Sequence, residues 1–457
     1  MDQATSRQAQ GGSAQGGSAQ GGSAQGGSAQ GGSAQGGSAQ GGSAQGRQDQ
    51  AGSTQGRPVQ AGSDQDSATV LILGAGPAGL VLGNLLLAAG VDCLIVERQS
   101  RAHVEQRARA GFLAANTVRI LTANGLADGL LANGQQHDTC AFRTDSGEFE
   151  LGYRDLGRRE VHTVYPQQDL VRDLVAEFLA RGGELRFETA AIGISGLDGD
   201  RPEVLTQGPD GARRLLHGRF VAGCDGRHGL ARTAIPEGAA RRTGRDHGVS
   251  WLALLAAAPQ SLAAVTYAVH QDGFAGHMAR TPQVTRYYLQ VEHGTDPADW
   301  TDDRVWDELQ LRMRTDQYGP LHQGPILERR VLNMASDVLD PIQYGRLFLV
   351  GDAASLISPS AAKGANLAIM EAEVLAQALA SQLRNGDEGP LTRYSADCLP
   401  RIWRAQEFSH WMINLLHGPA GKDDEAAFLR ALQRTRLENL RTSRRHQDQF
   451  AEQYVGI

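Results

Sequence analysis

The chain has 457 residues, a formal net charge of −7 and a sequence pI near 6.0. An acidic balance of this kind argues against a nucleic-acid partner or an anionic membrane surface. The four cysteines (Cys93, Cys140, Cys224 and Cys398) form no C-x-x-C pair and have no metal-ligand spacing, so we expect no metal site and a reducing, cytoplasmic compartment.

The first 66 residues differ in composition from the rest. Residues 11–45 are seven consecutive copies of Gly-Gly-Ser-Ala-Gln, and degenerate copies follow at 51–55 and 61–65. This repeat has almost no apolar surface to bury, so nothing offsets the entropy of ordering it. We expect residues 1–66 to be a disordered low-complexity tail, because a pentad β-solenoid would need an apolar stacking position. The remainder exceeds one ordinary core, so two or three domains are expected.

The stretch from residue 70 to residue 91 carries no charge and is long enough to span a bilayer. Glycines and a proline interrupt its first half, and no basic segment of a signal peptide precedes it. We therefore interpret this stretch as a buried strand, a turn and a helix.

The same stretch contains a dinucleotide-binding pattern. Gly74, Gly76 and Gly79 match G-x-G-x-x-G between an apolar strand and a helical apolar pattern, and a second strand delivers Glu97. The three glycines permit, in order, a tight turn, close approach of a pyrophosphate and close packing of the helix on the strand. Glu97 is placed to accept hydrogen bonds from ribose hydroxyls. The pattern predicts dinucleotide binding but does not separate FAD from NAD.

Two later strand-and-acid motifs separate the two cofactors. A short apolar strand ends in Asp225-Gly226, and another ends in Gly351-Asp352. A loop at 358–366 then leads into a long apolar helix, about residues 367–383, closed by Gly386. Each motif alone is equally compatible with an ordinary turn capped by an aspartate. The set of motifs in this order is typical of flavoproteins.

Together these motifs resemble those of the single-component (class A) FAD-dependent aromatic hydroxylases, and especially the members that hydroxylate 4-hydroxybenzoate. The similarity runs from about residue 70 to the C-terminus and includes uncommon stretches at 107–111, 222–226, 286–291 and 345–352. It implies an α/β fold with a Rossmann-like FAD-binding domain, an inserted β-rich substrate domain and a helical C-terminal region. The implied boundaries are 67–140, 160–245 and 335–385 for the FAD-binding domain, 141–159 and 246–334 for the substrate-binding domain, and 386–457 for the helical dimerisation region.

The resemblance also implies the residues that bind the cofactors. Those for FAD are Gly74, Gly76, Gly79, Glu97, Arg109, Gln167, Asp352, Lys363, Gly364 and Asn366. The co-substrate NADPH or NADH, which reduces the flavin before O2 reacts, would contact Arg98, Gln99, Arg107 and His228. Ala335 and His103 stand where the family has an arginine and a tyrosine, so the choice between the two coenzymes stays open.

For the substrate, the resemblance implies a small aromatic acid whose carboxylate is bound by Arg280 and Tyr288. Tyr267 and Tyr454 would relay a proton from the ring hydroxyl, and the carbonyl of Pro359 would accept a hydrogen bond from the same hydroxyl. A relay is needed because a phenol reacts better as phenolate but is mostly protonated at neutral pH. The implied reaction converts 4-hydroxybenzoate to 3,4-dihydroxybenzoate.

Some positions near the substrate depart from the family pattern. Met278 stands where the family has a serine that helps to bind the carboxylate. Gly276 and Val265 replace larger aliphatic residues near the ring, and Phe112 replaces a smaller one. These changes leave open another aromatic acid, such as 4-aminobenzoate.

The sequence also bears on two other functions and on assembly into a dimer. A flavin-dependent halogenase should contain W-x-W-x-I-P, which this sequence lacks. A non-catalytic flavin-binding redox module is disfavoured by the retention of the substrate and relay residues. The C-terminal region carries an apolar helical stripe that indicates core packing or, by resemblance, part of a homodimer interface: Trp403, Phe408, Trp411, Met412, Leu415 and Leu416.

Overall fold

A computed structural model describes residues 66–107, 111–145, 147–315, 319–419, 421 and 423–456. These residues belong to the unit Gly56–Ile457. The predictions for the tail, apart from residue 66, and for Arg109 lie outside the described residues.

A six-stranded sheet contains the first strand of the described chain. Its strand order is β18 (Gln343–Tyr344), β19 (Leu347–Leu349), β12 (Phe220–Gly223), β1 (Val70–Leu73), β2 (Cys93–Val96) and β8 (Glu184–Arg186). All neighbours pair in parallel except β18 with β19. β1, β2 and β12 are buried along their whole length, as continuous apolar runs require in a sheet covered on both faces.

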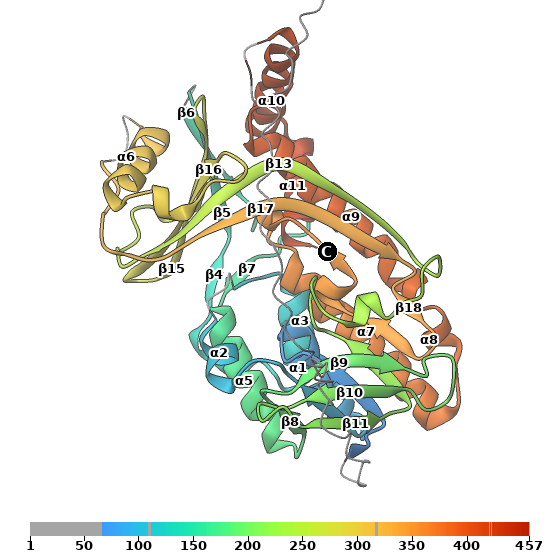
Figure 1. Ribbon diagram of the computed structural model, residues 1–457. Coiled ribbons are helices and arrows are strands. Elements are labelled where there is room, and N and C mark those ends of the chain that lie inside the picture. Colours follow the sequence, from blue (N-terminus) through green and yellow to red (C-terminus); the bar gives the residue numbers. More distant parts are fainter. Residues whose placement is uncertain are drawn as a thin grey trace, which may run out of the picture. The chain divides into compact units, whose positions relative to one another are not determined.

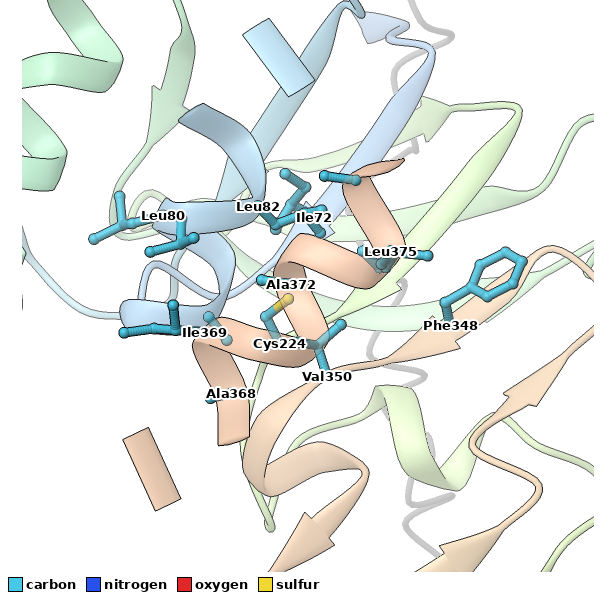
Figure 2. Packing of buried hydrophobic residues seen from close by; sticks show 14 of the residues in the cluster. Ile72, Leu80, Leu82, Cys224, Phe348, Val350, Ala368, Ile369, Ala372 and Leu375 are labelled. Atoms are coloured by element: carbon cyan, nitrogen blue, oxygen red, sulfur yellow. The ribbon is translucent and has the colours of Figure 1, made fainter. Parts of the chain in front are cut away.

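Helices α1 (Pro77–Ala88), α5 (Gln167–Ala180) and α7 (Gly364–Asn385) pack with this sheet. Figure 2 shows Ala368, Ile369, Ala372 and Leu375 of α7 beside Ile72 of β1 and leucines of α1. The sequence prediction of a long helix closed by Gly386 is confirmed, and this glycine has φ +69°. The shorter helices are α2 (Arg101–Gln106), α3 (Ala115–Ala123) and α4 (Asp128–Asn133).

An eight-stranded sheet is the largest sheet in the described structure. Its order is β20 (Ser355–Leu356), β17 (Ile326–Asp340), β13 (Arg241–Ala256), β16 (Val284–Val291), β15 (Gly273–Thr281), β14 (Val265–His270), β5 (Thr139–Thr144) and β6 (Gly147–Gly152). The long strands β13 and β17 run antiparallel, side by side (Figure 1). One face packs on α6 (Asp302–Met313) through Tyr287, Leu289 and Trp306.

Two small sheets and a group of helices complete the described structure. The sheets are β11 (Arg213–His217), β10 (Glu203–Gln207) and β9 (Ala190–Ser195), and β3 (Phe112–Leu113), β7 (His162–Val164) and β4 (Gln135–His137). The C-terminal helices are α8 (Gly389–Thr392), α9 (Tyr394–Leu416), α10 (Asp424–Thr442) and α11 (Arg444–Val455). The predicted fold class is therefore confirmed. None of the helices that the structure describes is both long and apolar enough to cross a membrane.

Candidate active site

The predicted nucleotide-binding turns all lie at one edge of the six-stranded sheet. β1 leads into Gly74, β2 into Glu97, β12 into Asp225 and β19 into Gly351-Asp352. Because these strands are parallel, their carboxyl ends meet at the same edge, where open α/β sheets bind ligands. The sheet thus gathers motifs that are far apart in the sequence.

The first turn has the shape that a pyrophosphate needs. Gly74 has φ +103°, and a Cβ on Gly79 would lie 2.0 Å from the Gly74 carbonyl oxygen. A Cβ on Gly76, in contrast, would meet no atom within 4 Å. α1 begins at Pro77 with no side-chain cap and no acidic residue in its first turn. Its free backbone N–H groups and its dipole therefore favour an anion beside Gly76.

Glu97 is fixed by the backbone on either side of it. One carboxylate oxygen accepts from Ala75 N–H at 2.9 Å, and the other accepts from Gln99 N–H at 2.8 Å. Each oxygen retains a second lone pair. The half-buried carboxylate can therefore also accept from ribose hydroxyls.

The Gly351-Asp352 turn rests on a buried glutamate that the sequence did not single out. Glu371 of α7 is 0% exposed and accepts Gly351 N–H at 2.6 Å. Burial raises the pKa of its carboxyl to about 8. Asp352 is half-buried beside it. The geometry of the four turns fits a dinucleotide such as FAD.

The loop before α7 is tied to the protein itself. Asn366 Oδ1 accepts from Ala114 N–H and Thr117 Oγ1, both at 2.8 Å, while its Nδ2 donates to the carbonyls of Phe112 and Ala362. Since every polar atom of this side chain is engaged, a flavin beside it would meet the backbone of the loop. Gln167, at the start of α5, is buried.

The residues assigned to NAD(P)H lie on the outside of the same edge. Arg98 and Gln99 follow β2, Arg107 follows α2, and His228 lies in the turn after β12. Arg98, Arg107 and His228 are exposed. Burial raises the pKa of the Asp225 carboxyl, and the positive charge of Arg98 opposes this with a smaller lowering effect. The structure thus brings Arg98 near the turn that carries His228.

The strand residues that the sequence predicts near the substrate share one face of the eight-stranded sheet. Gly276 of β15 lies directly opposite Tyr267 of β14 on one side and Tyr288 of β16 on the other. Two strand spacings separate the tyrosines by ~10 Å. Met278 pairs with Arg286 two residues further along. The two tyrosines therefore flank a position without a side chain.

Two arginines make this face strongly cationic. Arg280 donates to Gln168 Oε1 at 2.7 Å, and burial together with the nearby Arg286 lowers the pKa of Arg280 to about 10. Arg286 is 8% exposed, and its Nε and one Nη have no hydrogen-bond partner among the described residues. Its nearest carboxylate, that of Glu328, lies 4.0 Å away. A buried guanidinium whose charge is balanced only by one carboxylate at this distance is costly, so an anionic ligand fits here.

Sequence reasoning did not assign a site role to Arg286. Its alternation with Tyr287 placed it on the same strand face as Tyr288, and the structure confirms this. That face was the only signal available, because a strand arginine is ordinarily a surface cation.

The space near Gly276 is not empty. A Cβ at this position would meet Phe274 Cζ at 2.9 Å, and the Phe274 ring stacks on Trp251 with centroids 4.9 Å apart. Val265 and Phe112 are buried in the same cluster. The Phe274 ring thus takes part of the volume that the smaller residue at 276 leaves.

Tyr267 and Tyr454 meet directly. Their hydroxyl oxygens are 2.7 Å apart, and both side chains are buried. Burial raises the pKa of both phenols, so they stay neutral at physiological pH. A neutral phenol both donates and accepts a hydrogen bond, so the pair can pass a proton without holding a charge.

The loop around Pro359 joins the flavin side to the C-terminal helices. Pro359 is exposed, and its carbonyl accepts Ala362 N–H at 3.0 Å. Lys363 is 2% exposed and donates from Nζ to the carbonyls of Tyr454, at 2.8 Å, and Gly456. Burial lowers the pKa of Lys363 to about 7. No group of three or more histidine, cysteine and acidic residues that could hold a metal occurs among the described residues.

Comparison with known proteins agrees with this geometry. Residues 67–409 match the family described as FAD binding domain. The chain is 33% identical over 388 residues to p-hydroxybenzoate hydroxylase of Acinetobacter baylyi, covering 85% of this chain and 95% of that protein. It is 27% identical over 372 residues to a 3-amino-4-hydroxybenzoate 2-monooxygenase of Streptomyces platensis, covering 77% of this chain and 89% of that one.

A solved structure shows the same fold. That of p-nitrophenol 4-monooxygenase from Pseudomonas putida superimposes with a TM-score of 0.71 at 20% identity. The match covers 86% of this chain and 99% of that one.

Proposed function

Because the chain belongs to the FAD-binding-domain family, as a class A flavin-dependent aromatic hydroxylase, we propose that it hydroxylates an aromatic acid of the 4-hydroxybenzoate type, ortho to its ring hydroxyl. The chain is an enzyme that uses FAD, O2 and NAD(P)H. The observation that supports the proposed substrate is that one face of the eight-stranded sheet carries buried Arg286 at one end and the Tyr267–Tyr454 pair at the other.

In this proposal the cofactor lies along the four turns of the sheet edge. Gly74, Gly76 and Gly79 accommodate its pyrophosphate, Glu97 binds the adenosine ribose and Asp352 a ribityl hydroxyl. The other flavin contacts come from Arg109, Gln167 and the loop of Lys363, Gly364 and Asn366. FAD, when bound, carries electrons from NAD(P)H to O2, a chemistry that no side chain supplies.

The substrate carboxylate binds at the cationic end. Arg280 and Tyr288 contact it, and Arg286 offers two nitrogens that have no hydrogen-bond partner among the described residues. Met278 offers only a weak thioether acceptor where a serine hydroxyl would donate. The two arginines compensate for that loss, so an acid is still bound.

The tyrosine pair removes the proton from the ring hydroxyl. Tyr267 accepts this proton while its own passes to Tyr454, along the 2.7 Å hydrogen bond between them. Tyr454 in turn gives up its own hydroxyl proton, which ends in solvent, so neither phenol keeps a charge. The Pro359 carbonyl orients the hydroxyl through its second lone pair. The substrate is thereby more electron-rich at the carbon that becomes hydroxylated.

Outside this site, Arg98, Gln99, Arg107 and His228 form the proposed NAD(P)H contacts. We also propose a homodimer that uses the C-terminal helices. Of the apolar stripe on α9, Phe408, Met412, Leu415 and Leu416 are buried within the chain, whereas Trp403 is 45% exposed. Sedimentation of the wild type and of Trp403→Ala measures whether this exposed side contributes to assembly.

The experiment that tests the function is oxidation of NADPH and NADH by the holoenzyme, with and without 4-hydroxybenzoate, with the product identified by mass. Strong stimulation and a dihydroxybenzoate product support the proposal and show which coenzyme is used. FAD-bound protein that gives no such product overturns the substrate, and 4-aminobenzoate is then the next compound, in keeping with the aminobenzoate relative.

Two variants test the proposed roles of Arg280 in substrate binding and of Tyr267 in proton transfer. Arg280→Ala should weaken binding of 4-hydroxybenzoate by several kcal/mol, because it truncates one partner of a partly desolvated ion pair. Tyr267→Phe should keep binding but slow hydroxylation. An unchanged dissociation constant in the first variant, or undiminished product formation in the second, contradicts the corresponding role.

A further inference from the structure

A surface pocket of about 420 Å³ lies among α3, α7 and α9, and α7 packs on both of the other helices. All three helices line it, and none of its lining residues belongs to the proposed FAD, NAD(P)H or substrate contacts. Pockets that bind small molecules commonly measure about 300–1,000 Å³ and combine apolar walls with a few convergent polar groups. The volume therefore suits a small organic ligand.

Three polar side chains of this pocket are not engaged by the rest of the described chain. Asn116 Oδ1, on α3, is buried without a hydrogen-bond partner, and such atoms are rare. Rotation about the last torsion of Asn116, which is soft for an amide, can turn either end toward the pocket. Glu373 of α7 is half-buried and Arg401 of α9 is exposed, and neither forms a hydrogen bond or an ion pair with another described residue. These groups are therefore available to a ligand.

The charges of the pocket favour an acid that also carries a hydrogen-bond donor. Arg401 can bind a carboxylate with a planar pair of N–H groups. Arg119 supplies a second guanidinium, whose Nη1 donates to Glu160 at 2.7 Å while its other N–H groups remain available. Burial raises the pKa of Glu373, and the positive charge of Arg401 opposes this at longer range. The Glu373 carboxyl can accept a hydrogen bond in either protonation state.

The rest of the lining is apolar. It consists of Ile120, Ala123 and Met370, and the side chains of Ile120 and Met370 are 9% and 3% exposed. Such side chains can pack on a ring but offer it no strong hydrogen bond. An inorganic anion would use only the guanidinium groups, and a fatty acid would leave Glu373 and Asn116 without a donor. A hydroxylated aromatic acid matches the whole lining better than either of these.

We propose that this pocket is a second ligand site of the enzyme, which binds a small hydroxylated aromatic acid. Arg401 binds the carboxylate, and Glu373 and Asn116 accept hydrogen bonds from ring hydroxyls. Ile120 and Met370 pack on the ring. The proposed substrate and its product, which has one more hydroxyl, both belong to this class. The proposed hydroxylation does not use this site, so the inference goes beyond that function.

A ligand in this pocket bridges the helices that hold the flavin-side loop. Thr117 of α3 donates from Oγ1 to Asn366 Oδ1 at 2.8 Å, and the N–H of Ala114, just before α3, donates to the same oxygen. Asn366 lies in the first turn of α7. Because a ligand that binds only the folded protein stabilises it, occupancy of the pocket should raise the unfolding temperature of the holoenzyme. This rise should be absent in Arg401→Ala.

The test is equilibrium dialysis of the holoenzyme, in separate series, against 4-hydroxybenzoate, 3,4-dihydroxybenzoate and benzoate, with the amount bound per chain measured at saturation. Arg401→Ala removes the carboxylate contact of the second site, and Glu373→Leu removes the acceptor for a ring hydroxyl. Arg404→Ala is the matched control, because Arg404 is an exposed arginine of the same helix that does not line the pocket. Arg280→Ala disables the proposed substrate site and leaves the pocket intact.

The wild type and Arg404→Ala should each bind one molecule more per chain than Arg401→Ala, whose affinity at the pocket should fall at least ~10-fold. The hydroxylated acid with the higher affinity there shows whether substrate or product is the ligand. Benzoate should bind the wild-type pocket ~10-fold more weakly than that acid, and Glu373→Leu should abolish this difference.

Equal binding by the wild type and Arg401→Ala overturns the second site. A hydroxyl preference that persists in Glu373→Leu overturns the assigned orientation of the ligand. If Arg401→Ala removes all binding while Arg280→Ala changes none of it, the proposed substrate site fails and the second site stands.

Discussion

Glu371→Gln tests whether a buried carboxyl under the Gly351-Asp352 turn is protonated in the folded enzyme. Glu371 is 0% exposed, one of its oxygens accepts Gly351 N–H at 2.6 Å, and the other has no partner among the described residues. Burial raises the pKa of this carboxyl from 4.5 to about 8. The folded protein therefore keeps a proton that the unfolded chain releases.

The sign of the effect follows from this difference. The stability contributed by the protonated carboxyl is complete below about pH 4.5 and is lost as the pH rises towards the folded pKa of about 8. At about 1.4 kcal/mol per pH unit, the wild type should lose about 3 kcal/mol between pH 5 and pH 7 through this group. Glutamine does not ionise, and its amide oxygen can still accept Gly351 N–H.

The assay is urea unfolding of the holoenzyme, followed by far-ultraviolet circular dichroism at several pH values. The stability of Glu371→Gln relative to the wild type should rise by about 3 kcal/mol from pH 5 to pH 7. Glu425→Gln, at an exposed position on α10, controls for the loss of one negative charge. A difference between Glu371→Gln and the wild type that stays constant with pH would show that Glu371 is ionised in the fold, and the reasoning would be refuted.

Four further substitutions test the packing of the site. Gly79→Ala places a Cβ 2.0 Å from the Gly74 carbonyl oxygen and should lower both the stability of the protein and its FAD content. The Cβ of Gly76→Ala meets no protein atom within 4 Å, so this variant should fold normally but retain less FAD. Flavin absorbance per chain measures the FAD content, and a melting curve measures the stability. Trp251→Phe removes the donor that bonds His417 Nε2 at 2.6 Å, which should cost about 1–3 kcal/mol in urea unfolding. Asn366→Leu removes four hydrogen bonds and should cost about 4 kcal/mol by the same measurement; unchanged stability in either case contradicts the assigned contacts.

Local patterns in the sequence predicted which turns follow the strands of the six-stranded sheet and therefore meet at one edge. Gly74, Gly79 and Glu97 lie within one strand–helix–strand unit, so their spacing fixes how they meet. Asp225 and Asp352 follow apolar strands, and parallel pairing brings the ends of such strands together. The alternation around Arg286 likewise assigned its strand faces, because side chains in a strand alternate strictly.

Contacts made by side-chain packing could not be predicted in this way. The volume left by Gly276 suggested room for a different substrate, but the Phe274 ring on the same strand occupies part of it. Whether a ring turns over a neighbouring glycine depends on its rotamer and on Trp251 from another strand. Tyr153 and His162 each bury an atom that has no hydrogen-bond partner among the described residues. The sequence could not show this, since a missing partner depends on every side chain that surrounds the atom.

The hydrogen bonds of Lys363 could not be predicted from its residue type and its position in the sequence, because they depend on long-range contacts. The resemblance to the flavin hydroxylases implied only that Lys363 belongs to a loop that contacts FAD. In the structure its buried ammonium donates to the carbonyls of Tyr454 and Gly456, because a buried charge needs acceptors. These acceptors lie more than ninety residues further along the chain, beyond the reach of any local pattern. The flavin-side loop and α11 therefore constrain each other, so a substitution at Lys363 shifts the Tyr454 hydroxyl as well as removing a charge.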